Sequence, residues 1–91
     1  MKTLREYIDI INAAYTQVSE GKEVYWQSRL NDVDDFGDKF TDTMIDGKTN
    51  MGPWANMTPD SWAKHGVGQF GVGSGQLYKK QPDDRWLKIK G

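Results

Sequence analysis

The sequence has no cysteine and a single histidine among its 91 residues. Without cysteine, no disulfide framework and no thiolate site can form, and His65 has no thiol partner. A Ser-His-Asp triad would have to draw on ordinary surface serines such as Ser61 or Ser74, and the place of His65 beside Gly66 is typical of a helix end. A hydrolytic carboxylate pair would need a cleft that a chain of this size rarely builds. We therefore expect no enzymatic activity.

The sequence also has little hydrophobic material. Hydrophobic residues make up 36% of the chain and the mean hydropathy is −0.79. No run approaches the roughly 18 apolar residues of a membrane span, and MKTLREY lacks the apolar core of a secretory signal. Aromatic residues reach 12%, with four tryptophans, and a few large rings can anchor a thin core. The chain is therefore expected to form one small domain, residues 1–91, that is not secreted and has no membrane partner.

The net charge of −1 hides an uneven distribution. Residues 31–46 hold six aspartates and one lysine, a local charge of −5, whereas residues 76–91 hold five cations and two aspartates, a local charge of +3. The two regions either face each other across the fold, or one of them meets a charged partner.

The N-terminus predicts a long helix. Thr3 and Glu6 fit a capping box, and Gly21 stands where a left-handed helix cap is expected. Seven apolar residues follow at helical spacing: Leu4, Tyr7, Ile8, Ile11, Ala14, Tyr15 and Val18. The helix is therefore expected to run from Leu4 to Glu20 as scaffold. Residues 23–30 alternate in a way that favours a strand.

The acidic segment has a helical period of its own. Val33, Phe36, Phe40 and Met44 are spaced by three and four residues, and the same spacing holds for Asp35, Asp38, Asp42 and Asp46. This predicts an amphipathic helix that ends at Gly47 and carries an exposed row of carboxylates. The row could bind a basic partner or imitate the phosphates of a nucleic acid. Gly37 and the like charges at i and i+4 oppose this helix.

A metal site and a nucleotide site are both considered and rejected. The segment that begins at Asp32 matches only the opening of a calcium loop, because Phe36 and Thr43 occupy two of the ligand positions. A weak divalent site among the four aspartates of residues 32–38 is the remaining alternative. The segment from Gly66 to Gly71 reads G-x-G-x-x-G, but it lacks the flanking βαβ unit that a dinucleotide needs. We expect no metal and no cofactor.

The region before the glycine-rich stretch predicts a loop and a short helix. Residues 48–57 are expected to form the loop. Thr58 can then cap a third, short helix, with Pro59 in its first position and Trp62 turned inward. Residues 66–75, half of them glycine, would let the chain turn from this helix into the C-terminal segment.

The C-terminus predicts a β-hairpin. A three-residue loop, 82–84, places Leu77, Leu87 and Ile89 on one face. The other face then carries four residues that we take as candidate binding residues, namely Tyr78, Lys80, Trp86 and Lys88. Their rings and ammonium groups suit a partner surface or a nucleic acid. Equally, the lysines could lie over the rings as intramolecular cation–π pairs.

These elements predict an α+β fold. It has a long N-terminal helix, an acidic amphipathic helix, a short third helix and a small antiparallel sheet that ends in the hairpin. The strand at 23–30 should join that sheet, because an isolated hairpin is marginal in water.

The opening MKTLREYIDIIN resembles the first residues of small bacteriophage-encoded accessory proteins of unassigned role. The resemblance implies a phage or mobile-element origin. Because the sequence shows no secretory signal and no membrane span, the expected location is the host cytoplasm or the interior of the virion. We expect a non-catalytic protein–protein interaction module, an inhibitor or assembly factor that binds a host or virion protein. Partner contacts are expected through the hairpin residues or through Asp35, Asp38, Asp42 and Asp46. The alternative is nucleic-acid binding by the hairpin, against which the near-neutral net charge counts. Self-association is left open.

Overall fold

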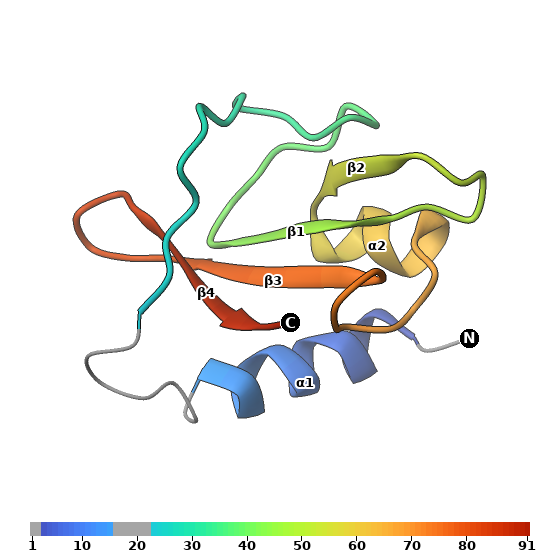
Figure 1. Ribbon diagram of the computed structural model, residues 1–91, viewed down its shortest axis with the longest axis horizontal. Coiled ribbons are helices and arrows are strands. Elements are labelled where there is room, and N and C mark those ends of the chain that lie inside the picture. The colour runs from blue at the N-terminus through green and yellow to red at the C-terminus, as the bar shows by residue number, and fades with distance from the viewer. Residues whose placement is uncertain (1–2, 16–22) are drawn as a thin grey trace.

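A computed structural model of the protein describes residues 3–15 and 23–91. Within these residues the elements follow one another as α1 (Leu4–Tyr15), β1 (Thr43–Lys48), β2 (Trp54–Met57), α2 (Pro59–His65), β3 (Gly75–Lys80) and β4 (Trp86–Lys90) (Figure 1). Helices and an antiparallel sheet in one small chain confirm the α+β class.

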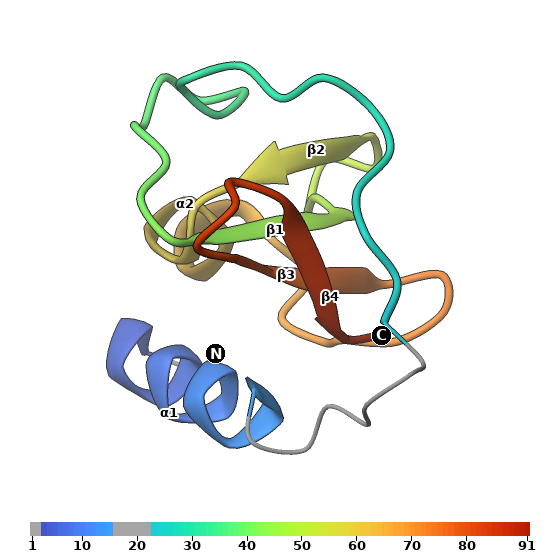
Figure 2. The same cartoon turned by 90° about the vertical axis from the view of Figure 1, so that its left-hand side faces the viewer.

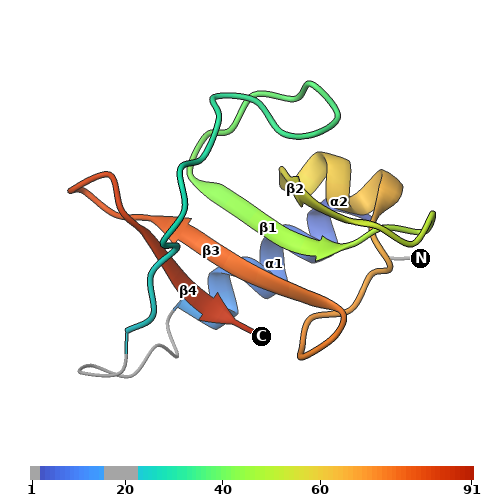
Figure 3. The same cartoon turned by 45° about the horizontal axis from the view of Figure 1, so that its top comes forward.

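The four strands form one antiparallel sheet in the order β2-β1-β3-β4. Ile45 of β1 pairs with both Met57 of β2 and Leu77 of β3, so these three side chains share one face. They are fully buried there with residues of both helices. Figure 3 shows α1 and α2 behind the sheet, with the first part of the segment 23–42 crossing in front of β3 and β4.

Trp62 of α2 occupies the centre of the core. Its ring lies 6.3 Å from that of Tyr7 and 5.4 Å from that of Phe70. A Cβ atom at Gly47 would lie 2.5 Å from the Trp62 ring, and one at Gly66 would overlap the ring. These glycines thus leave the space that the indole fills.

The N-terminal helix begins as predicted. The Thr3 hydroxyl accepts a hydrogen bond from the backbone N–H of Glu6 at 3.3 Å, and the Glu6 carboxylate accepts one from the backbone N–H of Thr3 at 3.3 Å. Tyr7 and Ile11 are buried, whereas Ile8 is exposed. The predicted extension to Glu20 and the Gly21 cap lie outside the described residues.

The short helix is also confirmed, although it is the second helix of the described chain. The Thr58 hydroxyl caps α2 by accepting from the backbone N–H of Ser61 at 3.2 Å, and Pro59 stands in the first turn. Asp60 and Lys64 form an ion pair of 3.0 Å along its exposed side. The cap and the proline fit the beginning of a helix that aims Trp62 into the core.

The predicted acidic helix is wrong. Described residues 31–42 form no helix, and Thr43–Lys48 is strand β1. The Asp34 carboxylate accepts hydrogen bonds from the backbone N–H groups of Phe36 and Asp38, at 2.9 and 2.8 Å. Gly37 adopts a left-handed φ of 86°. An aspartate that bonds the backbone locally offers it an alternative to the helix, and here that alternative prevails.

Two further segments differ from their predictions. The segment 23–30 is not a regular strand: it pairs with β4 through a single bridge between Tyr25 and Leu87. Within the predicted loop at 48–57 the chain makes a tight turn, in which Thr49 N–H donates to the Pro53 carbonyl at 3.0 Å, and returns as β2. Neither structure could be predicted from the segment's own residues, since each depends on pairing with another strand of the sheet.

The C-terminal hairpin has the predicted register next to its loop, but a register shift between Leu77 and Tyr78 pairs Leu77 with Lys90. Lys80 pairs with Trp86, and the N–H of Gln81 donates to the carbonyl of Arg85 at 2.7 Å. Leu77 and Leu87 are buried. The glycine-rich segment before the hairpin turns sharply, with positive φ values at Gly68, Gly71 and Gly73, as expected.

Candidate functional site

Residues 24–42, which we call the strap, first cross the sheet on the side away from the helices. The later part of the strap reaches α2, where the ring of Phe36 stacks on that of His65 at 4.1 Å. Figure 2 shows the strap and α1 on opposite sides of the sheet. One end is bonded to β4, where Trp26 N–H donates to Trp86 O at 2.9 Å. The other end reaches β2, where Asp35 N–H donates to Asn56 O at 3.1 Å and Asn56 N–H donates to the Asp35 carboxylate at 2.8 Å. The strap therefore occupies part of both outer edges of the sheet.

The strap covers much of the hairpin face that the sequence presents as a binding surface. The ring of Trp26 packs edge-on against Tyr78 at 5.5 Å, and Tyr78 is only 5% exposed. The N–H of Lys88 donates to the carbonyl of Val24 at 2.6 Å. The prediction that Tyr78 stands on the solvent face is wrong, because a distant segment uses the ring for packing.

Trp26→Ala is expected to lower the free energy of unfolding by about 2 kcal/mol, less than for a fully buried tryptophan because the ring is half-buried. Trp26→Phe keeps a ring and removes the buried indole N–H, which has no hydrogen-bond partner among the described residues, so it should cost much less. Urea denaturation measures both changes. Trp54→Ala is the control for an exposed ring, and an equal loss in Trp26→Ala and Trp54→Ala would contradict the packing role.

Lys80 and Trp86 line a hollow of about 440 Å³ at the loop end of the hairpin, the hairpin pocket. The Lys80 ammonium lies 5.9 Å from the centre of the Trp86 ring, and Phe40 packs on the same ring at 6.1 Å. The remaining lining residues are Leu30, Asn31, Asp32, Lys39, Thr41 and Asp84. The intramolecular cation–π alternative is thus confirmed for Lys80.

Three cations of the hairpin have acidic neighbours. Ion pairs join Lys79 to Asp42 at 2.9 Å, Lys80 to Asp84 at 3.5 Å and Arg85 to Asp83 at 2.7 Å. The Lys79–Asp42 pair links the acidic and basic regions, as one interpretation of the charge pattern expects. A charged partner would have to compete with these carboxylates for the hairpin.

The aspartates of residues 31–46 lie in different environments and do not share one face. Asp34 is buried, and its carboxylate accepts the Thr58 N–H at 3.0 Å in addition to the two strap N–H groups. Asp35 bonds β2. Asp46 lies half-buried on β1, where desolvation first and the nearby charge of Asp35 second raise the pKa of its carboxyl. The predicted row of carboxylates is therefore not formed.

Asp38 and Asp42 meet at a second hollow of about 430 Å³, the α1 groove, between α1 and the C-terminal end of the strap. Its apolar side comes from Leu4, Ile8 and Ile11, at positions i, i+4 and i+7 of the helix. Leu4 is 38% exposed and Ile8 is 40% exposed. The other lining residues are Asn12, Asp38, Lys39, Thr41, Asp42, Thr43, Thr58, Pro59, Asp60 and Lys79.

The wall of the α1 groove is held by side-chain hydrogen bonds. The Thr58 hydroxyl, which also caps α2, donates to the Asp38 carboxylate. The Asp42 carboxylate accepts a hydrogen bond from the Lys79 ammonium at 2.9 Å. This bond lowers the pKa of the Asp42 carboxyl, and its effect exceeds that of desolvation, which acts in the opposite direction. The groove thus has a fixed polar wall opposite an apolar helix flank.

The predicted site residues therefore lie in separate places in the structure. It brings Asp38 and Asp42 together in the α1 groove and Lys80 and Trp86 together in the hairpin pocket, and it buries Tyr78. Sequence reasoning missed the exposed pair Leu4 and Ile8, because both fit the apolar stripe of α1. The sequence does contain one indication of this exposure. The apolar stripe of α1 is wider than the face of a helix that packing against one neighbouring surface can bury.

Two structural features are absent from the described residues. Among residues 3–15 and 23–91, no three histidine, aspartate or glutamate side chains are grouped so as to hold a metal ion. No helix in the same residues is long and apolar enough to cross a membrane. Comparison with protein-family models, with curated proteins and with solved structures gave no match.

Proposed function

We propose that this protein is a non-catalytic protein–protein interaction module that docks its partner in the α1 groove. The observation that carries the proposal is the exposure of Leu4 and Ile8 inside a hollow with a polar rim. Protein interfaces have this anatomy, with an apolar centre that excludes water and a polar border that remains wet. Large apolar side chains grouped in a hollow are also more informative than single exposed ones.

The shape of the groove suits a segment of a protein. Its apolar side extends over eight positions of α1, from Leu4 to Ile11, which is about 10 Å of helix. Side chains at this spacing can receive the anchors of a partner helix or extended segment. Of its three large apolar residues, only Leu4 and Ile8 are exposed, so the groove itself leaves little apolar surface in water.

The resemblance of the N-terminus to small phage accessory proteins supports a host or virion protein as the partner. An accessory factor of this kind acts by occupancy: bound to its partner, it blocks or recruits another contact. Such a role needs a stable scaffold and a docking surface, and no reacting group.

Leu4→Ser combined with Ile8→Ser is expected to weaken partner capture at least tenfold, since two interface anchors are truncated. Both side chains are already exposed in part, so the fold should be retained, as circular dichroism will show. The measurement is quantitative co-precipitation from host lysate with the partners identified by mass spectrometry.

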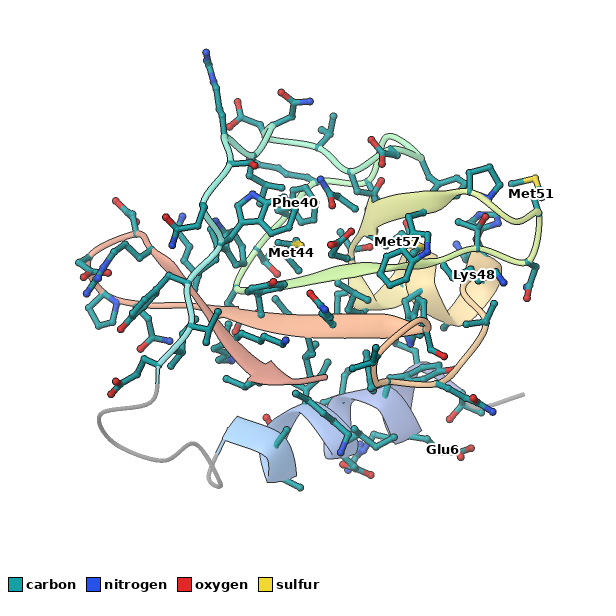
Figure 4. The ribbon with its side chains drawn as sticks, viewed as in Figure 1. Glu6, Phe40, Met44, Lys48, Met51 and Met57 are labelled. Atoms are coloured by element: carbon teal, nitrogen blue, oxygen red, sulfur yellow. The ribbon has the colours of Figure 1, made fainter. Side chains whose placement is uncertain are left out.

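The matched control is Met51→Ser combined with Val72→Ser, which removes two exposed apolar residues outside the groove. Met51 is 74% exposed and Val72 is 95% exposed. Met51 lies at the tip of the β1–β2 turn (Figure 4). Retention of the same partners by the groove variant and by this control would rule out the α1 groove as the docking site.

The second candidate function is nucleic-acid binding at the hairpin pocket. It is favoured by one observation, the grouping of Lys39, Lys80 and Trp86 around a hollow that could receive a base. Titration of fluorescent single-stranded and duplex oligonucleotides at about 50 mM salt tests it, with Lys80→Glu plus Lys88→Glu as the comparison. Tight binding that the double variant abolishes would replace the protein-partner proposal.

A further inference from the structure

We infer that a hollow between the beginning of α1 and the glycine-rich segment binds a small organic cation that carries a primary ammonium group. This hollow, which we call the Tyr7 hollow, has a volume of about 470 Å³, within the range that small-molecule ligands occupy. Its lining residues are Glu6, Tyr7, Asn50, Gly66, Val67, Gly68 and Gln69. It shares none of them with the α1 groove or the hairpin pocket, so the inference does not depend on the docking function.

A buried hydroxyl group without a protein partner stands in the wall of the hollow. The side chain of Tyr7 is only 1% exposed, and its ring packs against those of Trp62 and Phe70. Within the described ranges of the chain, its hydroxyl forms no hydrogen bond. A Cβ atom at Gly68 would lie 3.0 Å from the hydroxyl oxygen, so this oxygen lies beside the glycine that lines the hollow. Buried polar side chains are almost always hydrogen-bonded, and this hydroxyl is therefore suited to a bound ligand.

The charge of the hollow comes from Glu6. One oxygen of its carboxylate, Oε1, accepts hydrogen bonds from the N–H and the hydroxyl of Thr3, at 3.3 and 3.2 Å. No cation of residues 3–15 and 23–91 forms an ion pair with this carboxylate, and no described lysine, arginine or histidine lines the hollow. Unlike Asp42 and Asp60 of the α1 groove, Glu6 therefore keeps an uncompensated charge. A cationic ligand compensates this charge, whereas an anionic ligand is repelled by it.

The hollow offers acceptors for the three N–H donors of an ammonium group. Two acceptors come from α1, the Glu6 carboxylate and the Tyr7 hydroxyl. Desolvation first and the charge of Glu6 second raise the pKa of the Tyr7 hydroxyl, so it stays neutral. Two more acceptors are the side-chain amide oxygens of Asn50, from the β1–β2 turn, and Gln69, from the glycine-rich segment. α2 ends beside Gly66, and the negative end of its dipole adds to the attraction for a cation.

The apolar part of the hollow fits a small molecule better than a protein partner. Val67 and the backbone of the glycine-rich segment offer a contact for a short alkyl chain. None of the large apolar residues that are exposed in the described chain lines the hollow. A protein interface has an apolar centre of such residues. The ligand is therefore a free alkylammonium compound and not a lysine of a docked protein.

Two small probes of opposite charge test the inference with the full chain. n-Butylammonium and butyrate have alkyl chains of similar length, and each is titrated at constant ionic strength into ¹⁵N-labelled protein while amide chemical shifts are recorded. n-Butylammonium should shift the amides of Tyr7, Asn50, Gly68 and Gln69 saturably, with a dissociation constant of roughly 1–10 mM, as is usual for so few atoms. Butyrate should bind at least about tenfold more weakly, because it brings a second negative charge to Glu6.

Isosteric variants separate the two groups that carry the inference. Tyr7→Phe removes only the hydroxyl and should weaken the binding of n-butylammonium about three- to tenfold. Glu6→Gln removes the charge and should weaken it at least about fivefold. A glutamine still completes the capping box with Thr3, so α1 should begin as before. The matched control is Glu23→Gln, at an exposed carboxylate outside the hollow, which should leave the affinity unchanged.

The outcomes decide the inference in either direction. Equal binding of the two probes, no saturable shift with n-butylammonium up to about 100 mM, or an unchanged affinity in Glu6→Gln and Tyr7→Phe would overturn it. Tighter binding of a capped lysine, Nα-acetyl-lysine N-methylamide, than of n-butylammonium would assign the hollow to a lysine of a partner protein and overturn it as well. None of these results bears on the docking function, because the Tyr7 hollow and the α1 groove have no residue in common.

Discussion

Trp62→Ala is expected to lower the free energy of unfolding by about 4 kcal/mol, the usual cost of removing a large buried aromatic side chain. Trp62 is fully buried and packs against Tyr7 and Phe70. Domains of this size are stable by only about 5–15 kcal/mol, so the variant should be near its unfolding midpoint at elevated temperature. Urea and thermal denaturation followed by circular dichroism measure the loss.

The glycines around Trp62 allow a stricter test of the same packing. Gly66→Ala should cost about 3 kcal/mol, because the added methyl group overlaps the indole and the core is overpacked. In a Trp62→Leu background the ring is gone, so the same substitution should cost less than about 1 kcal/mol. Val72→Ala, at an exposed position, serves as the control. Equal costs for Gly66→Ala in both backgrounds would contradict the proposed contact.

The second large effect is expected at Asp34. Asp34→Ala should lower the free energy of unfolding by about 3 kcal/mol, since it leaves backbone N–H groups of Phe36, Asp38 and Thr58 without their acceptor. The loss would loosen both the strap and the beginning of α2. Asp32→Ala, at an exposed neighbour, should cost less than about 0.5 kcal/mol. Urea denaturation distinguishes the two, and similar losses would contradict a role for this network.

The Asp34 contribution should depend on pH in one direction. Desolvation raises the pKa of the carboxyl, but hydrogen bonds, from the Ser61 side chain and then from backbone groups, outweigh it and hold the pKa below 3.8. A lowered pKa in the folded state means that the stabilisation is present above the unfolded value of about 3.9 and is lost as the pH falls through the folded value. The stability difference between wild type and Asp34→Asn should therefore shrink below about pH 4. A difference that stays constant from about pH 7 to about pH 2 would contradict this linkage.

The elements that the sequence predicted correctly are those whose signals are local. The Thr3 and Thr58 caps begin the helices where their hydroxyls meet nearby N–H groups. The hairpin register next to the loop followed from requiring Leu77, Leu87 and Ile89 on one face. In each case the deciding contacts lie within a few residues, or between two strands joined by a short loop.

The elements that could not be predicted depend on distant contacts. The period of residues 33–46 is helical, yet Asp34 bonds Thr58, 24 positions away, and β1 pairs with β3. The exposure of Leu4 and Ile8 in the α1 groove likewise depends on which distant segments pack against the helix. Sequence periodicity identified the apolar side of α1, but only the fold shows that Leu4 and Ile8 are left at its edge.

The burial of Tyr78 also depends on a contact with a distant segment. The hairpin alone presents this ring to solvent, and the strap, far earlier in the chain, covers it with Trp26. Pairing rules within the hairpin carry no information about such a cover. The predicted four-residue surface was therefore reduced to Lys80 and Trp86 at the hairpin pocket, with Lys88 half-buried beside the strap.

Site-specific photo-crosslinking tests the docking groove most directly. A benzophenone amino acid replaces Ile8, Trp86 or Val72 in separate proteins, which are irradiated in host lysate, and the crosslinked partners are identified by mass spectrometry. We expect one dominant partner to crosslink at position 8, to be displaced by excess unmodified protein, and to be missing at positions 72 and 86. A partner that crosslinks at position 86 and not at position 8 would contradict docking in the α1 groove.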